Sequence, residues 1–175
     1  MNIGLLGFGV VGGGVWELAQ ENRALNVKKV LVRREAPPLG KAAVQDVEAI
    51  LRDTDIDTVV EVLGGLHPAY EWICRALAAG KDVVTANKAV ISAYYRELTA
   101  LAHENGAALR CTAAVGGGIP WLVNLQRCRR VDTVTEVGGI MNGTTNFIMD
   151  AMARQGADFP TVLQRAQEVG YAEAD

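Results

Sequence analysis

The sequence predicts an α/β fold built around a doubly wound parallel sheet. Short apolar segments alternate with amphipathic segments long enough to form helices, which is the pattern of β-α-β units. Glycines follow several apolar segments, and the loops after parallel strands meet at the carboxyl edge of the sheet, where ligands bind. Near residue 131 the pattern changes. We therefore expect two domains, residues 1–130 and residues 131–175, the second a partial α+β domain, which the resemblance given below implies to be a substrate and dimerisation domain.

The individual elements are predicted from apolar spacing and from the glycines and prolines that interrupt it. Strands are expected in five segments of the first domain, which are residues 2–6, 27–34, 57–65, 81–88 and the start of 107–120. Helices are expected after the first glycines and over residues 41–53, 67–80, 91–106 and 121–130. In the second domain we expect one long strand over residues 133–141, then a polar cluster and two helical segments.

Composition excludes several classes of protein. The chain has 175 residues, of which 50% are hydrophobic, and a formal net charge of −3. Mild acidity argues against broad nucleic-acid binding, which requires a basic face. No apolar run approaches the roughly 20 residues that span a bilayer, and the first residues lack the basic leader of a signal peptide. We expect a cytoplasmic protein without nucleic-acid or membrane partners.

The cysteines and histidines do not form a recognisable site in the sequence. Cys74, Cys111 and Cys128 are too far apart for metal-ligand spacing, and each has apolar neighbours. We expect them to be buried free thiols. His67 and His103 are isolated from one another and from other ligand-forming residues.

A glycine motif directly follows the first expected strand. The segment GFGVVG runs from Gly7 to Gly12 and contains Phe8, Gly9, Val10 and Val11. In a G-x-G-x-x-G motif the first glycine permits a tight turn, the second lets the backbone approach a pyrophosphate, and the third lets helix and strand pack closely. The following helix N-terminus offers free N–H groups to phosphates. This context predicts a Rossmann-type dinucleotide-binding domain.

The end of the second strand is expected to select the cofactor. An acidic residue there holds the ribose hydroxyls of NAD, whereas an arginine accommodates the 2′-phosphate of NADP. This chain has Arg33 and Arg34, followed by Glu35. We favour NADP, because guanidinium groups bind phosphate through paired hydrogen bonds. The alternatives are a solvated charge pair, or NAD binding through Glu35.

Two further segments at the carboxyl edge are candidates for cofactor contact. Gly64 and Gly65 end one buried strand, and Asn87 and Lys88 follow the next. A lysine there is suited to binding a carboxylate or phosphate, or to assisting proton transfer. The alternatives are a solvated lysine at a helix start and an asparagine that only caps the helix.

Three consecutive glycines, residues 116–118, form a loop after the last expected strand of the first domain. Such a loop exposes backbone amides and carbonyls. It could contact the cofactor or surround a monovalent cation, Na⁺ or K⁺, with carbonyl oxygens. The alternative is a plain turn between strand and helix.

The segments GFGVVG, EVLGG, VVTANKAV, AVGGGIP, GGIMNGTTNFIMD and ADFPTVLQRAQEVGYAEAD, in this order, resemble the homoserine dehydrogenase family. The resemblance covers essentially the whole chain. It implies NAD(P)-dependent interconversion of aspartate 4-semialdehyde and homoserine, in threonine and methionine synthesis. It also implies that the family continues beyond GYAEAD to the lysine favoured as acid/base. The strand expected over residues 133–141 would have an open edge and an apolar face, so we expect self-association as a homodimer or a larger assembly.

The same resemblance assigns roles to particular residues. Lys88 matches a family lysine near the nicotinamide. The substrate cleft is implied to include Asn142, Gly143, Thr144, Thr145 and Glu173. The family's cation site corresponds to the carbonyl groups of Thr112, Val115, Gly117 and Ile119.

Two other functions are compatible with parts of the sequence. One is a non-catalytic NADP-binding module, either a sensor or a subunit completed by another chain, or a fragment that lacks the C-terminal catalytic half. The other is a different Rossmann-type oxidoreductase acting on a small aldehyde or sugar, which accounts for the glycine motif but not for the NGTTN segment.

Overall fold

The structure is a computed structural model that describes residues 1–34, 36–140 and 142–172. The chain forms two compact units, Met1–Arg127 and Cys128–Asp175, and each is described by itself. Among the helices of the described residues, none is both long and apolar enough to cross a membrane.

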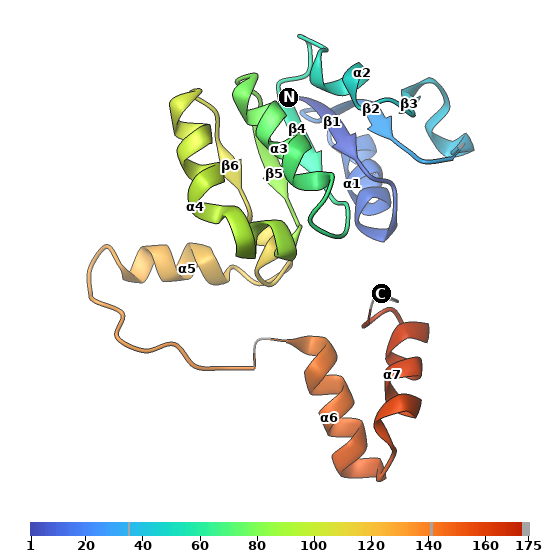
Figure 1. The fold of residues 1–175 in the computed structure, drawn as a ribbon, viewed down its shortest axis with the longest axis vertical. Coiled ribbons are helices and arrows are strands. Elements are labelled where there is room, and N and C mark those ends of the chain that lie inside the picture. The colour runs from blue at the N-terminus through green and yellow to red at the C-terminus, as the bar shows by residue number, and fades with distance from the viewer. Residues whose placement is uncertain (35, 141, 173–175) are drawn as a thin grey trace. The chain divides into compact units, whose positions relative to one another are not determined.

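The first unit contains a six-stranded parallel sheet in the order β3-β2-β1-β4-β5-β6 (Figure 1). The strands are β1 (Asn2–Leu6), β2 (Asn26–Leu31), β3 (Ala43–Val44), β4 (Thr58–Glu61), β5 (Asp82–Thr85) and β6 (Leu109–Arg110). The strand order runs outward from β1 in both directions, which is the arrangement of a doubly wound Rossmann-type sheet. The expected fold of the first domain is confirmed.

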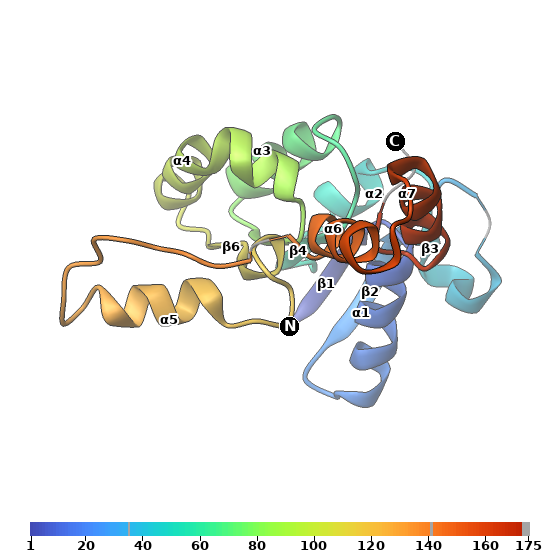
Figure 2. The ribbon, with the colours of Figure 1, turned by 90° about the horizontal axis from the view of Figure 1, so that it is seen from below.

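Helices cover both faces of this sheet. Figure 2 shows α1 (Val10–Glu21) on one face and α3 (Ala69–Ala78) and α4 (Lys88–Glu104) on the other. The remaining helices are α2 (Glu48–Leu51) and α5 (Trp121–Cys128), with 3-10 turns at η1 (Pro37–Ala42) and η2 (Thr112–Ala114). Alternate residues of the strands face opposite sides, so β1 places Leu5 in the core beneath α1 and Leu6 in the core beneath α3 and α4.

The described residues of the second unit form two helices, α6 (Gly143–Gln155) and α7 (Phe159–Glu168). Their contact buries Ile148, Ala151, Val162 and Ala166. Gly156 ends α6 in a left-handed conformation with a φ of +63°, which glycine adopts without the penalty of a Cβ. The two short helices therefore pack as an antiparallel pair around a small apolar core.

Two sequence predictions of secondary structure are wrong. The helix expected over residues 41–53 is divided into β3 and the single turn α2, because Ala43 and Val44 pair with the edge of β2. The strand expected over residues 133–141 is not formed across residues 133–140, where no described residue pairs with the segment. Met141 lies outside the described residues. An apolar segment becomes a strand only where a neighbour accepts its backbone hydrogen bonds.

The cysteines are free, as expected, but they are not uniformly buried. Cys111 is buried, Cys74 is partly buried and Cys128 is exposed. Cys128 ends α5, a helix that has no buried residue, so the apolar neighbours of this cysteine in the sequence do not enclose it.

Candidate functional site

The glycine turn between β1 and α1 has the geometry of a phosphate-binding loop. Gly7 has a φ of +106°, which strains any residue with a Cβ. A Cβ on Gly12 would lie 2.3 Å from the carbonyl oxygen of Gly7, whereas a Cβ on Gly9 would meet nothing within 4 Å. The helix is therefore pressed against the turn at Gly12, and space is open above Gly9 at the N-terminus of α1. An anion such as a pyrophosphate fits this position.

A cleft of about 850 Å³ opens beside this turn, and its volume lies within the range of small-molecule sites. It is bordered by the carboxyl ends of β1, β2 and β4 and by the start of α3. Its lining consists of Gly7, Phe8, Gly9, Leu31, Val32, Arg33, Arg34, Ala36, Gln45, Val62, Leu63, Gly64, Pro68 and Trp72.

The cleft brings together some of the expected cofactor residues and not others. The glycine turn, both arginines and Gly64 line it, and Arg33 and Arg34 are exposed. The others lie outside its lining; they are Val10, Val11, Gly12, Gly65, Asn87 and Lys88. Glu35 lies outside the described residues. Sequence reasoning missed Gln45, Pro68 and Trp72, of which only Trp72, an aromatic residue in the first turn of α3, gave a signal in the sequence.

Next to Val62 and Leu63 of the cleft lining, Glu61 ends β4 as a fully buried carboxyl group. Its Oε1 accepts hydrogen bonds from the Leu63 N–H at 2.7 Å and the Asn87 side-chain amide at 3.4 Å. Its Oε2 accepts from the Thr85 hydroxyl at 2.5 Å. Burial raises the pKa of Glu61, and these donors oppose the rise. The sequence held a signal for this residue, because an acid inside an apolar strand requires partners.

Asn87 joins this buried carboxyl group to the start of α4. Its side-chain carbonyl accepts the Val90 N–H at 3.1 Å, so it caps the helix, as the simpler interpretation of the sequence predicted. Its amide donates to the Gly65 carbonyl at 2.8 Å. Lys88 is the first residue of α4 and is exposed. The lysine is thus a helix-start residue that also stands at the carboxyl edge of the sheet.

The glycine loop after β6 contains the four expected cation ligands. Gly116 has a φ of +78°, and its carbonyl accepts the Ile119 N–H at 2.9 Å. The Thr112 and Ile119 carbonyls also accept backbone N–H groups. Each carbonyl keeps a second lone pair, so the residue types present suit a hard monovalent cation, and no geometry of coordination follows from these contacts.

In the second unit, the NGTTN segment is the first turn of α6. The Asn142 side chain accepts the Thr145 N–H at 2.9 Å and caps the helix. The Thr144 hydroxyl donates to the Tyr171 carbonyl beyond α7. Glu173 lies outside the described residues. The polar cluster therefore has a local role in shaping the helix pair.

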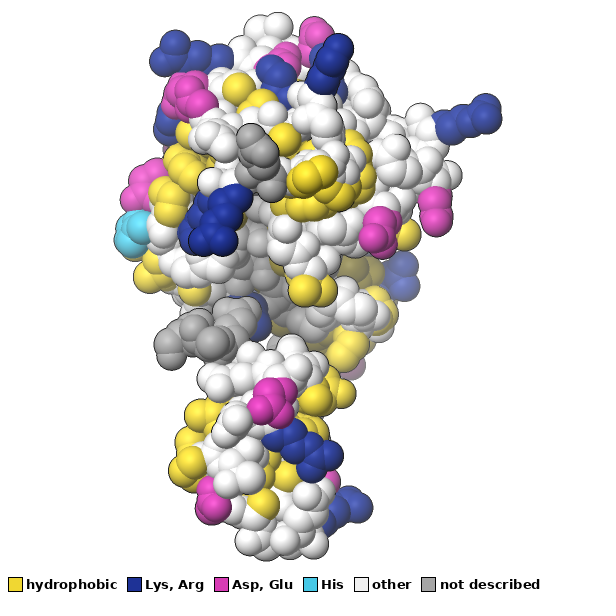
Figure 3. Space-filling model, turned by 90° about the vertical axis from the view of Figure 1, so that its right-hand side faces the viewer, with side chains coloured by type: hydrophobic (Ala, Val, Ile, Leu, Met, Phe, Trp, Pro, Cys, Tyr) yellow, Lys and Arg dark blue, Asp and Glu magenta, His cyan; other side chains and the backbone are white. Residues whose placement is uncertain are grey.

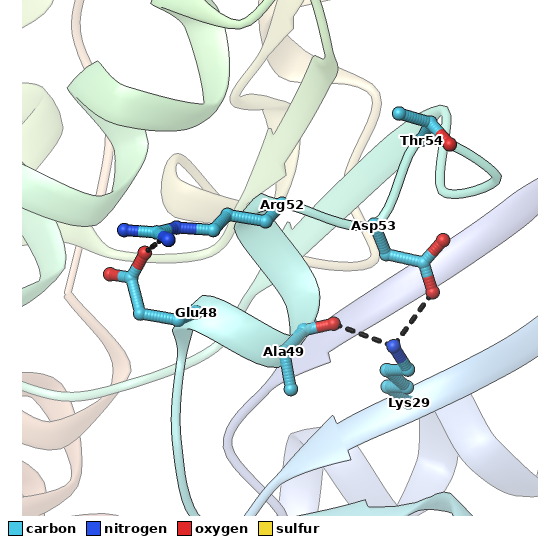
Figure 4. A pocket seen from close by; sticks show the side chains of 6 residues that line it. All are labelled: Lys29, Glu48, Ala49, Arg52, Asp53 and Thr54. Atoms are coloured by element: carbon cyan, nitrogen blue, oxygen red, sulfur yellow. Dashed lines mark hydrogen bonds and ion pairs between the residues drawn. The ribbon is translucent and has the colours of Figure 1, made fainter.

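A second depression, of about 460 Å³, lies at Lys29, Glu48, Ala49, Arg52, Asp53 and Thr54 (Figure 4). Its charged groups bind one another: Lys29 pairs with Asp53 at 2.8 Å, and Glu48 pairs with Arg52 at 2.8 Å and with Arg75 at 2.6 Å. Acidic and basic side chains are likewise interspersed on the face shown in Figure 3. These neutralised charges make the depression a weaker candidate than the cleft.

A glycine turn at a helix N-terminus, beside a cleft at the carboxyl ends of parallel strands, defines a dinucleotide-binding α/β protein. Two family models match the chain: the NAD-binding domain of homoserine dehydrogenase over residues 7–112, and homoserine dehydrogenase over residues 120–175. The chain belongs to the homoserine dehydrogenase family.

Known relatives agree with this assignment. Homoserine dehydrogenases of Synechocystis sp. and Bacillus subtilis are 43% and 38% identical over the whole chain, which covers 43% and 44% of their lengths. The crystal structure of a homoserine dehydrogenase from Thiobacillus denitrificans matches the whole chain, and 44% of its own, with a TM-score of 0.88 and 37% identity. The chain thus spans less than half the length of these relatives.

Proposed function

We propose that this chain forms the nucleotide-binding domain and the first part of the catalytic domain of an NADP-dependent oxidoreductase. The reaction is the interconversion of L-aspartate 4-semialdehyde and L-homoserine, within threonine and methionine synthesis. The observation that carries the proposal is the cleft, because it combines a phosphate-binding glycine turn with two arginines at the end of β2. Membership of the family supports the choice of substrates.

Different residues of the cleft are assigned to different parts of the cofactor. The turn at Gly7 and Gly9 presents backbone N–H groups and the N-terminus of α1 to the pyrophosphate. Arg33 and Arg34 bind the 2′-phosphate of the adenine ribose. Gly64, together with Gly65, leaves room for backbone approach at the end of β4. When bound, the nicotinamide supplies or accepts the hydride of the reaction.

The relative affinity of the chain for NADP and NAD tests the role assigned to Arg33 and Arg34. Calorimetric titration of the chain with both oxidised nucleotides at low salt should show tighter binding of NADP. A charge-assisted hydrogen bond contributes about 1.5–3 kcal/mol, so Arg33→Ala or Arg34→Ala should reduce the preference on the order of tenfold. Arg23→Ala is the matched control, because Arg23 is exposed beyond the C-terminal end of α1. Equal affinity for NADP and NAD in the unmutated chain would refute this selection.

We assign substrate binding to the residues that the family resemblance implies for the substrate site. Lys88 attracts the anionic substrate and assists charge transfer at its carbonyl, while Asn142, Gly143, Thr144, Thr145 and Glu173 contact or shape the amino-acid site. In the natural protein, Lys88→Ala should greatly reduce kcat without changing the melting temperature. Arg96→Ala removes another positive charge of α4 as a control. Unchanged turnover would show that Lys88 is only a solvated residue at the start of a helix.

The glycine loop is assigned a monovalent cation, held by the carbonyls of Thr112, Val115, Gly117 and Ile119. Carbonyl oxygens favour hard cations such as Na⁺ and K⁺, and the cation would hold the loop in one conformation. Replacing either ion by tetramethylammonium at constant ionic strength should lower the melting temperature of the chain. An identical melting temperature in all three salts would argue for a plain turn.

Three further predictions from the sequence belong to the same proposal. They are a domain boundary near residue 130, association of the chain with a second copy, and a cytoplasmic location. Light scattering of the natural protein measures the second of these directly, and a strictly monomeric mass would count against it.

A further inference from the structure

Glu61 carries a buried carboxyl group that takes no part in the proposed binding of the phosphates and the ribose. It is fully buried at the end of β4, and in the register of the sheet it lies opposite Thr85, the last residue of β5. None of the salt bridges in the described part of the chain includes Glu61. Its three hydrogen-bond partners are all donors in the contacts described above. They lower the pKa of Glu61 and so oppose the larger effect of burial, which raises it.

The position of Glu61 relates it to one end of the proposed cofactor. A dinucleotide crosses the sheet at the switch point, with its pyrophosphate at the first β-α turn and its adenine ribose at the end of the second strand. Here those places are the turn at Gly7 and the end of β2, which carries Arg33. The nicotinamide must then lie toward β4 and β5, on the other side of β1. Glu61 and Thr85 end these two strands.

The nicotinamide ring changes charge in the reaction. It is cationic when oxidised and neutral when reduced, whereas the phosphates and the adenine ribose are unchanged. A fixed negative charge near the ring therefore interacts differently with the oxidised and the reduced form. Because the carboxyl group is buried, water screens its charge less than it screens a charge on the surface.

We propose that the carboxylate of Glu61 selects the oxidation state of the bound nucleotide, stabilising the oxidised nicotinamide relative to the reduced one. The inference rests on the proposed nucleotide-binding function. Glu61 acts as a positioning residue as well, since its bond to the Leu63 N–H fixes the turn that lines the cleft, but positioning alone affects both oxidation states alike.

The test compares the dissociation constants of NADP⁺ and NADPH for the 175-residue chain, by calorimetry and by nucleotide fluorescence, over a series of pH values. Because burial raises the pKa of Glu61, the preference for NADP⁺ should strengthen with rising pH as the carboxyl group ionises. Glu61→Gln removes the charge and keeps the shape, because a glutamine oxygen can accept from Leu63 while its amide donates to Thr85. The ratio of the two constants should shift against NADP⁺ on the order of three- to tenfold.

Two controls separate charge from structure. Glu104→Gln removes an equal charge at the exposed far end of α4 and should leave the ratio unchanged. Thr85→Val removes a donor that lowers the pKa of Glu61, so it should move the onset of the preference to higher pH and leave the preference intact above that onset. If Glu61→Gln weakens both nucleotides equally, or if Thr85→Val abolishes the preference at every pH, the proposal is overturned and the group is structural only.

A measurement on the unmutated chain gives an independent answer if Glu61→Gln fails to fold. Carboxyl-carbon NMR of Glu61 should show that NADP⁺ lowers the pKa of this group more than NADPH does, because linkage between charge and ligand is reciprocal. Equal effects of the two nucleotides would overturn the proposal. Binding of neither nucleotide to the unmutated chain would instead refute the nucleotide-binding function itself.

Discussion

The contact between α1 and the glycine turn predicts that Ala substitutions at two adjacent glycines have opposite effects on stability. In Gly12→Ala the new Cβ would lie 2.3 Å from the Gly7 carbonyl oxygen, about 1 Å inside an ordinary carbon–oxygen contact. Both partners are backbone, so the helix must move. In Gly13→Ala the Cβ would meet nothing within 4 Å. The two variants are otherwise matched, because both substitutions lie in the first turns of α1.

The magnitudes follow from the two competing terms. Replacing glycine by alanine within a helix stabilises it by up to about 1 kcal/mol, whereas overpacking costs about 1–3 kcal/mol. Gly13→Ala should therefore be more stable than Gly12→Ala by about 2 kcal/mol, which corresponds to a difference in melting temperature on the order of 5–10 °C. Displacement of the helix should also weaken NADP binding in Gly12→Ala alone.

Thermal unfolding followed by circular dichroism, with nucleotide titration of each variant, measures both effects. Equal melting temperatures and equal affinities would show that α1 does not press on the turn as described. The interpretation of the third glycine of the motif would then be wrong.

Three further predictions concern other parts of the chain. Lys81 is buried and its ammonium group donates to two backbone carbonyls at 2.6 and 2.7 Å. Lys81→Met should therefore lower the unfolding free energy by about 1–3 kcal/mol, measured by urea unfolding. Lys41→Met, at an exposed site, is the control and should leave the unfolding free energy unchanged. Burial raises the pKa of Glu61 above its ordinary value of 4.5, so the stability that it contributes is fully present below that value and is lost as pH rises through the folded-state pKa. The melting temperature of Glu61→Gln relative to the unmutated chain should therefore rise as the pH increases from about 4 through the folded-state pKa, and a constant difference would contradict the raised pKa. Asn142→Ala should cost about 1 kcal/mol of local stability in α6, seen as faster amide exchange there, whereas Asn142→Ser should retain the cap.

The sequence predicted those parts of the fold in which local pattern and tertiary contact agree. The strands β1, β4 and β5 each contain a short apolar run that glycine or a helix cap follows within a few residues, and each became a strand of the parallel sheet. The segment over residues 41–53 failed because its helical spacing competed with an edge pairing to β2. Strand pairing joins residues far apart in the chain, and spacing within one segment carries no information about it.

Part of the candidate site was likewise predicted from the sequence, and part was not. The glycine turn and Arg33 were found because their chemistry follows a motif of fixed spacing. Gln45 reaches the cleft only because β3 pairs beside β2, and Glu61 was passed over because it lies inside an apolar strand. Asn142 was recognised as polar but not as a cap, although an asparagine before a helical segment is the usual N-cap signal.

The two outermost strands of the sheet bear on how copies of this chain can meet. β3 and β6 each contain only two residues, and η1, which precedes β3, begins with two prolines. An edge this short offers few unpaired amide and carbonyl groups on which another chain could extend the sheet, and short edges are one of the means by which natural proteins resist aggregation. Association between copies should therefore proceed through side chains of other surfaces, and Leu109→Pro on β6 should leave it intact.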